Sequence, residues 1–370
     1  MFVDIHVQQT VPPSNLNRDD TGSPKSAIYG GVRRARVSSQ AWKRATRAEF
    51  AERLRAGDLG FRTKRVIDLV VAEAGARGTD VSRDELAKRA EAALNAIGLK
   101  TEKAKDKAGT QEYLPVTQYL VLYSRGQIEA LTDVILRDPK PSKKDVQAAL
   151  ESTHGVEVAL FGRMVADNKE LSVDASVQVA HALSTHAVDD ESDYFAAVDD
   201  LGRDDDAGAG MLGTIEFNSA TLYRYATINV AGLNASLHSA EDTARAVEAF
   251  IRDFALSMPT GKQNTFANNT LPDGVVVIVR RDRPVSLVGA FEDPVVPSPT
   301  SGIVSQSAER LVEQAHSTRA FVGEPVAAFV VHGGRRTAVL EELGDVCATV
   351  QELAAGVRGV VAASLGAAAS

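Results

Sequence analysis

The spacing of apolar and polar residues predicts strands on both sides of a long helical insertion. Val3, Ile5 and Val7 alternate with polar neighbours, which is typical of a strand with one buried face. The continuous apolar run 275–279 suits a buried central strand. Residues 61–183 have a mainly helical pattern instead.

The remaining elements complete a sheet with helices packed on it. Further strands are expected at 215–230 and 327–331, and helices at 38–54, 239–258, 303–319 and 340–353. Ser239 and Asp242 have capping-box spacing, as do Ser82 and Glu85 within the helical stretch. The Ala-rich tail 360–370 is expected to fray. This order predicts an α+β fold compatible with a ferredoxin-like core.

Composition restricts the class of protein. The 370 residues are 44% hydrophobic and 24% charged, as in ordinary globular proteins. The single cysteine, Cys347, excludes an internal disulfide and a multi-cysteine zinc site, and it fits a reducing compartment. The sequence lacks an apolar run of about 18 residues, so we expect no membrane partner and a cytoplasmic location.

The net charge of −8 conceals two regions of opposite sign. Residues 33–47 contain six Lys or Arg residues and no acid, which gives +6. Residues 189–206 contain nine acids and one Arg, which gives −8, so the rest of the chain is neutral overall. The negative net charge therefore does not exclude a nucleic-acid partner.

The basic region has features of a phosphate-binding face. Ser38 and Ser39 at a helix start would direct free backbone N–H groups and the positive end of the helix dipole outward. Nearby polar and basic side chains extend this face: Arg18, Lys25, Gln40, Lys43 and Arg47. Such a set suits binding along a nucleic-acid backbone without base reading. On these features alone, a solvated helix face remains an alternative.

The sequence offers little support for catalysis. The G-x-G-x-x-G match at 208–213 lacks the strand and helix that a dinucleotide site needs. His181 and His186 are five residues apart, off the spacing of helical zinc ligands, so we expect structural roles for both. Asp189 and Asp190 could in principle hold Mg²⁺, but a solvated face is favoured. We expect no catalytic residue, no metal site and no cofactor.

Several ordered motifs nevertheless resemble one family. They are the segments 15–20 (NLNRDD), 30–40 (GGVRRARVSSQ), 43–45 (KRA), 161–164 (FGRM), 178–181 (QVAH), 184–186 (STH), 194–195 (YF), 198–201 (VDDL), 213–219 (GTIEFNS), 223–225 (YRY) and 260–268 (TGKQNTFAN). Together they closely resemble the crRNA-binding backbone subunit of the type I-E CRISPR surveillance complex, Cascade (the CasC or Cse family).

The resemblance implies a fold shaped like a right hand. Residues 1–60 and 214–370 would form an RRM-like palm with a polar loop insertion, residues 61–183 helical fingers, and residues 184–213 a thumb hairpin. Several copies would stack along one crRNA and hold its spacer for pairing with target DNA in antiviral defence. Other Cascade subunits would be further partners, and the subunit itself would be no enzyme.

The resemblance also implies roles for particular residues. The crRNA backbone would be held by Arg18, Lys25, Ser38, Gln40, Lys43 and Arg47. Met164 would wedge between bases, an insertion that stacks without reading sequence. The thumb would pack against the strand or a neighbouring copy through Tyr194, Phe195 and Val198. Target DNA would face Lys140, Lys143 and Lys144.

A metal-dependent endoribonuclease of the related type III backbone family is the alternative. In that case the aspartates of the thumb, Asp199 and Asp200, would act as metal ligands. The two hypotheses differ in whether bound complementary RNA is cleaved in the presence of Mg²⁺.

Overall fold

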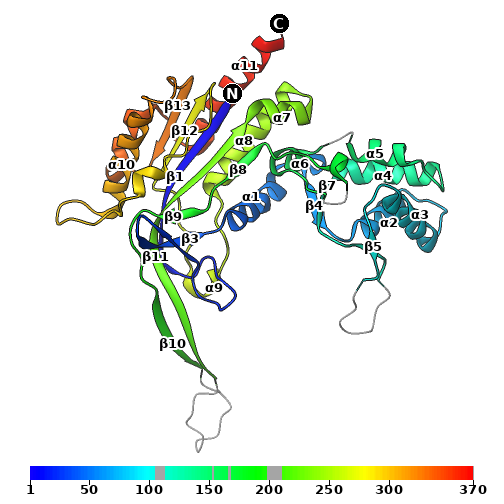
Figure 1. Ribbon diagram of the computed structural model, residues 1–370, viewed down its shortest axis with the longest axis horizontal. Coiled ribbons are helices and arrows are strands. Elements are labelled where there is room, and N and C mark those ends of the chain that lie inside the picture. Colours follow the sequence, from blue (N-terminus) through cyan, green and yellow to red (C-terminus); the bar gives the residue numbers. More distant parts are fainter. Residues whose placement is uncertain (105–112, 152–153, 166–167, 198–210, 370) are drawn as a thin grey trace, which may run out of the picture. The chain divides into compact units, whose positions relative to one another are not determined.

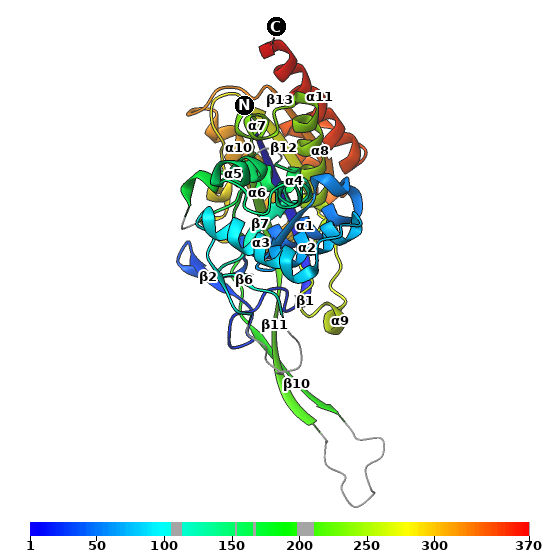
Figure 2. The same cartoon turned by 90° about the vertical axis from the view of Figure 1, so that its right-hand side faces the viewer.

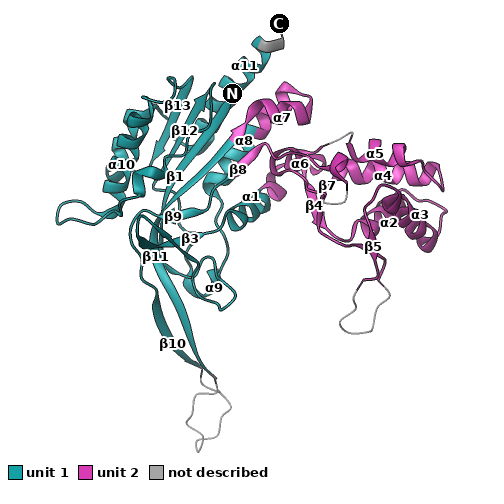
Figure 3. Cartoon of the chain, viewed as in Figure 1, with its two compact units in different colours: residues 1–49, 179–227, 247–370 teal, residues 50–178, 228–246 magenta. Residues whose placement is uncertain are grey.

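A computed structural model describes residues 1–104, 113–151, 154–165, 168–197 and 211–369. The chain forms two compact units, each built from segments that are separate in the sequence (Figure 3). Unit 1 comprises residues 1–49, 179–227 and 247–370, and unit 2 comprises residues 50–178 and 228–246.

Unit 1 contains a mixed sheet with the strand order β14–β13–β12–β1–β11–β9–β3–β2 (Figure 1). The strands in this order are β1 (Phe2–Ser14), β2 (Ser26–Tyr29), β3 (Val32–Val37), β9 (Ala182–Ser184), β11 (Met211–Asn229), β12 (Gly274–Arg280), β13 (Ala327–His332) and β14 (Asp345–Val346). Two more strands, β8 (Val177–Val179) and β10 (Glu191–Ala197), pair with β11. The central strand β1 is antiparallel to β12, with Phe2 opposite Arg280 and Gln8 opposite Gly274. All seven residues of β12 are buried, as the apolar run predicted.

Helices cover both faces of this sheet. They are α1 (Ser39–Arg53), α8 (Ala240–Leu256), α10 (Ile303–Thr318) and α11 (Val350–Ala369). Val276 and Ile278 pack into a cluster with Leu311 of α10, whereas Gly356 of α11 lies against Phe329 on the other face. The predicted combination of a sheet with packed helices is thus confirmed, and an RRM-like palm stays a prediction.

The strand β1 is buried on both faces, so the expectation of one exposed face is wrong. Its polar residues point into the side covered by α10 and are paired there. His6 Nδ1 lies 2.8 Å from the hydroxyl of Tyr223, Asp4 accepts from Tyr225 at 2.9 Å, and Gln8 donates to a carbonyl of α10 at 2.7 Å. The alternation therefore reflects internal hydrogen bonds, because a buried polar group is tolerated once it is paired.

A long β-hairpin projects from the sheet, as Figures 1 and 2 both show. It consists of β10 (Glu191–Ala197) and the first half of β11, paired from Glu191 opposite Phe217 to Ala197 opposite Met211. Residues 198–210, which connect the two strands, lie outside the described residues.

Unit 2 is mainly helical, as the pattern predicted. Its helices are α2 (Val66–Ala76), α3 (Arg83–Ala96), α4 (Arg125–Arg137), α5 (Lys143–Glu151), α6 (Val156–Phe161) and α7 (Val230–Leu237). Ser82 caps α3 by accepting from the N–H of Glu85, which confirms the predicted capping contact. Two small sheets, absent from the sequence prediction, are formed by β4 (Gly60–Thr63) with β7 (Val121–Ser124) and by β5 (Thr101–Glu102) with β6 (Val116–Thr117). No helix in the described portion of either unit has the length and apolar character to cross a bilayer.

The C-terminal prediction is wrong in its boundaries. A 3₁₀ helix, Arg335–Leu343, precedes the short strand β14, and α11 then runs to Ala369 instead of fraying after residue 360. Gly344 lies between the two helices. A side chain would not fit at this position, because a Cβ there would lie 2.4 Å from the carbonyl oxygen of Ala328. Leu353, Val357 and Val361 recur at helical spacing and are buried, which holds α11 in place.

A buried histidine, His6, and a half-buried one, His154, make stability depend on pH. Burial, together with the nearby Arg280, lowers the pKa of His6 to about 3, and burial, together with Arg163 and His238, lowers that of His154 to about 4. An unfolded histidine titrates near 6.5, so below that pH the unfolded chain binds protons that the folded chain does not. The free energy of unfolding should therefore fall by about 1.4 kcal/mol per pH unit for each histidine as the pH drops from 6.5 toward 5.

Urea unfolding at pH 7 and pH 5 would measure this effect. The variant His6→Gln should show a shallower pH dependence than the wild type. An identical slope in the two proteins would contradict a neutral His6 in the folded state.

Candidate nucleic-acid interface

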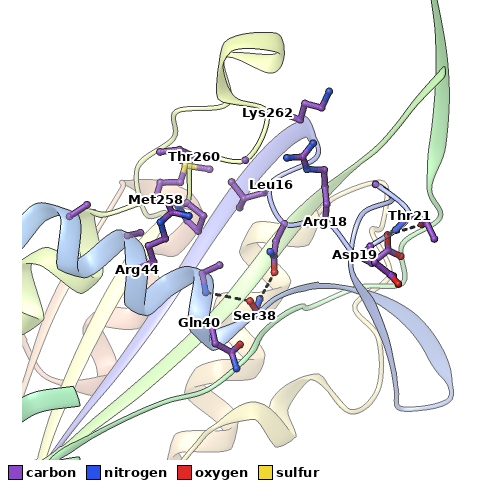
Figure 4. A pocket seen from close by; sticks show the side chains of 18 of the residues that line it. Leu16, Arg18, Asp19, Thr21, Ser38, Gln40, Arg44, Met258, Thr260 and Lys262 are labelled. Carbon is purple, nitrogen blue, oxygen red and sulfur yellow. Dashed lines mark hydrogen bonds between the residues drawn. The ribbon is translucent and has the colours of Figure 1, made fainter. Parts of the chain in front are cut away.

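Unit 1 contains a groove with a volume of about 980 Å³. Three segments form its walls: the loop 16–22, residues 38–49, which include most of α1, and the segment 258–262 that follows α8 (Figure 4). Three cationic side chains line it, namely Arg18 from the loop, Arg44 from α1 and Lys262 from the third segment. Three segments distant in the sequence thus bring three cations into one concave surface, which is also lined by three acids, Asp19, Asp20 and Glu49.

The loop wall is held in shape by its own polar side chains. The carboxylate of Asp19 accepts hydrogen bonds from the N–H and hydroxyl of Thr21 at 2.9 and 2.7 Å and from the N–H of Ser23 at 3.0 Å. These bonds, the Thr21 hydroxyl first, lower the pKa of Asp19. The buried Asn15 donates to the carbonyls of Gly22 at 2.9 Å and Glu216 at 2.8 Å, which ties the loop to the base of the β10–β11 hairpin.

The helix wall begins at Ser38, whose hydroxyl accepts from the N–H of Ala41 at 3.3 Å. The backbone N–H of Ser38 donates to Asn17 at 2.8 Å, and that of Ser39 donates to Nδ1 of His181 at 3.1 Å. The expectation of outward-facing free N–H groups at both serines is therefore wrong. His181 has the structural role predicted for it, as does His186, whose Nε2 accepts from the N–H of Thr221 at 3.1 Å.

The groove includes some of the predicted residues and leaves out others. Arg18, Ser38 and Gln40 line it. Lys43 and Arg47 are half-buried, do not line it, and each interact with other residues of the chain. Lys25 also lies outside it and borders a small adjacent cavity.

Arg44 and Lys262 are groove residues that the sequence reasoning did not select. Arg44 is four residues after Gln40, so the two share one helix face with the small side chains Ala41 and Ala48, which also line the groove. The spacing of four residues between Gln40 and Arg44 could therefore have identified Arg44 from the sequence. Lys262 has a left-handed backbone (φ 51°) and follows Gly261, and only the fold shows that it comes close to the loop 16–22.

The basic stretch 33–47 does not form a uniform +6 face. Arg34 is fully buried and donates to the carbonyls of Tyr29, Ser184, Phe291 and Glu292 at 2.8–3.1 Å. Arg33 pairs with Asp190 at 3.1 Å. Asp190, one of the two aspartates considered as metal ligands, is thus engaged in an ion pair, and its other oxygen accepts from Asn218 at 2.8 Å.

The predicted hairpin residues occupy both faces of the β10–β11 hairpin. Tyr194 is opposite Thr214 and 63% exposed, and Phe195 is opposite Gly213 and 40% exposed. Gly213 makes room for the Phe195 ring, since a Cβ there would lie 2.5 Å from it. Val198, Asp199 and Asp200 lie outside the described residues. The described residues include no group of three His, Cys, Asp or Glu side chains that could hold a metal ion.

Unit 2 carries the other predicted residues on its own surface. Met164 is 82% exposed, next to the buried Arg163, which donates to Leu171 at 2.7 Å and to Gln127 and Leu150 at 3.1 Å. Arg163 thus fixes the backbone that presents Met164. The three lysines at the start of α5 are also exposed: Lys140, Lys143 and Lys144.

The third groove wall depends on a close approach at Gly261. A Cβ at this position would lie 2.1 Å from the carbonyl oxygen of Leu16. Gly261→Ala should therefore displace the segment 258–262 and lower the free energy of unfolding by about 1–3 kcal/mol. Urea unfolding would measure this loss, with Gly323→Ala as control, because a Cβ at Gly323 meets no atom within 4 Å. Equal stability of the two variants would contradict the close approach.

The fold and the groove define an α/β protein with a groove lined by both cations and acids and with a projecting hairpin. The CT1975-like protein family matches residues 3–355, so the chain belongs to this family. Two matching chains of solved structures are titled "CRISPR RNA-guided surveillance complex, pre-nicking" and "CRISPR RNA-guided surveillance complex". The first is 34% identical with a TM-score of 0.83, covering 98% of this chain and 100% of that one. The second is 30% identical with a TM-score of 0.71, covering 97% and 100%.

A search of curated proteins gave no match. The family match and the solved structures confirm the resemblance to a Cascade backbone subunit, and the assignment to type I-E stays a prediction.

Proposed function

We propose that the protein is a non-catalytic, crRNA-binding backbone subunit of a type I-E CRISPR surveillance complex. Several copies assemble along one crRNA, together with other subunits of the complex. Each copy holds a segment of the spacer through its phosphates and presents the bases to target DNA. The protein itself reads no sequence, because base pairing by the guide supplies the specificity.

The groove of unit 1 is the observation that carries this proposal. Arg18, Arg44 and Lys262 line it from three segments, and Gln40 adds a neutral side-chain donor. Of the acids that also line it, Asp19 is already engaged by Thr21 and Ser23. Cations in a concave surface neutralise phosphates and follow the nucleic-acid backbone. The groove lies in a protein similar to chains of RNA-guided complexes, so the polyanion that fits the similarity is RNA.

The topology of unit 1 supports an RRM-like palm. Helix α1 follows β1, the strands β9 and β11 are antiparallel, and α8 leads from β11 to β12. The resulting order β12–β1–β11–β9 is that of a ferredoxin-like sheet. Most of unit 2 is inserted between α1 and β9, as fingers would be, and the projecting hairpin lies between β9 and β11, as a thumb would.

Exposed side chains outside the groove fit the remaining roles. Met164 is an exposed apolar side chain that could wedge between adjacent bases. Lys140, Lys143 and Lys144 present positive charge for target DNA. Tyr194 and Phe195 offer apolar surface to the strand or to a neighbouring copy.

Expression of the protein with a CRISPR array and the other subunits tests the proposal. The expected result is copurified RNA of one defined length, bound by several copies of the protein. RNA of random length, or none, would contradict it. The same complex should leave complementary RNA intact in Mg²⁺. Periodic cleavage abolished by Asp199→Ala or Asp200→Ala would instead establish the endoribonuclease alternative.

A further inference from the structure

A buried arginine lies between two aromatic rings in the core of unit 1. Arg224, in β11, is completely buried, with its guanidinium carbon 3.7 Å from the ring centre of Trp42 and 4.7 Å from that of Phe254. Both arrangements are cation–π contacts, which gain strength when they are removed from water. Trp42 belongs to α1 and Phe254 to α8, so one side chain joins two helices of the unit.

The charge of Arg224 has no carboxylate partner among the described residues. Its Nη1 donates to Gln9 at 2.6 Å and to the carbonyl of Ala255 at 3.3 Å, and its Nη2 donates to the carbonyl of Phe254. Those carbonyls belong to the last turn of α8, where the helix dipole favours a cation. Burial lowers the pKa of Arg224 to about 9, which still leaves it protonated at neutral pH.

The contacts of Arg224 extend to two of the three groove walls. Trp42 lies on α1 between Ala41 and Arg44, which line the groove. On the other side, Gln9 accepts from Arg224 and donates to the carbonyl of Thr270 at 2.9 Å and to the sulfur of Met258 at 3.9 Å. Gln9 therefore holds both ends of the segment 258–270, whose first five residues form the third wall.

We propose that Arg224, acting through Trp42 and Gln9, is a positioning residue that sets the spacing between the α1 wall and the 258–262 wall of the groove. This inference rests on the proposed function of the groove. Arg224 itself is buried and does not touch the RNA. It holds the wall that bears Arg44 and the wall that bears Lys262 so that both cations meet the same backbone.

The test measures the binding of a single-stranded RNA by fluorescence anisotropy at several salt concentrations, with purified protein kept well below its unfolding temperature. Arg224→Met removes the charge and the hydrogen bonds but keeps an apolar stem. Arg224→Lys keeps the charge without the planar fork. Gln9→Leu breaks the link to the segment 258–270 and removes one acceptor of Arg224, but it keeps the guanidinium and its contacts with Trp42 and Phe254. Leu340→Ala, a fully buried residue in the cluster on the α10 face, is the control for general loss of stability.

We expect Arg224→Met and Gln9→Leu to weaken RNA binding about tenfold, with a salt dependence shallower by about 0.7, the value of one lost phosphate contact. Arg224→Lys should lie between these variants and the wild type. Leu340→Ala should bind like the wild type, although it unfolds more readily.

Wild-type affinity and salt dependence in Arg224→Met and Gln9→Leu would overturn the inference, as would an equal loss of binding in Leu340→Ala. If Arg224→Met does not fold, Gln9→Leu and Arg224→Lys decide the question. Failure of the wild type to bind RNA at all would overturn the proposed function as well, so the two failures are distinguishable.

Discussion

Reversing the charge of Arg44 and Lys262 together is expected to weaken RNA binding about 100-fold at low salt. Both side chains line the groove, from α1 and from the segment 258–262. With Arg18 they give three phosphate contacts. Each contact with a single strand contributes about −0.7 to the slope, so the logarithm of the association constant should fall with log[salt] at a slope of about −2. The double variant Arg44→Glu and Lys262→Glu keeps only Arg18, so its slope should be about −0.7. Fluorescence anisotropy with one RNA at several salt concentrations measures both quantities.

Two further double variants locate the RNA relative to α1. Arg281→Glu with Arg283→Glu changes the same number of charges at exposed positions outside the groove, and it should bind almost like the wild type. Lys43→Glu with Arg47→Glu, the pair that the sequence selected, should have an intermediate effect. If this last pair caused the largest loss, the RNA would follow the other side of α1 and the groove would not be the binding site.

Removal of the buried Arg34 guanidinium should lower the free energy of unfolding by about 3–5 kcal/mol. In Arg34→Ala, the four carbonyls of Tyr29, Ser184, Phe291 and Glu292 lose their donor. A buried carbonyl without a partner costs much of its desolvation energy. Guanidinium chloride unfolding, followed by circular dichroism, provides the measurement.

The adjacent Arg33 provides the matched control. Its ion pair with Asp190 is partly solvated, with 55% of the Arg33 side chain exposed. Arg33→Ala should therefore cost about 0–1 kcal/mol. Similar losses in the two alanine variants would mean that Arg34 does not anchor the surrounding loops as described.

Features that depend on local sequence were predicted well. The caps at Ser82 and Ser239, the buried strand β12 and the helix α10 all follow from short patterns, and the structure confirms them. A capping residue contacts the backbone no more than three positions away, and an apolar run indicates a buried strand whichever element packs against it.

Features that depend on residues far apart in the sequence could not be predicted from it. Six basic residues in fifteen cannot reveal that Arg34 is the buried one, because three of its four carbonyl partners, Ser184, Phe291 and Glu292, belong to distant segments. For the same reason, the polar residues of β1 were assigned to solvent. The groove could be predicted only in part, because Arg18 and Lys262 line it together although they are more than two hundred residues apart in the sequence.

The order in which the strands occur has a consequence for synthesis on the ribosome. The central strand β1 is made before the other strands of the sheet, yet its partner β12 begins at residue 274, so the sheet of unit 1 has contacts of very long sequence separation. Residues 50–178 of unit 2, in contrast, are contiguous and emerge much earlier. Closing long loops slows folding, and domains generally fold as they emerge. Nascent chains shorter than about 280 residues will therefore carry the helical segment 50–178 together with a β1 whose β12 edge is still unpaired, a species that invites aggregation or chaperone binding.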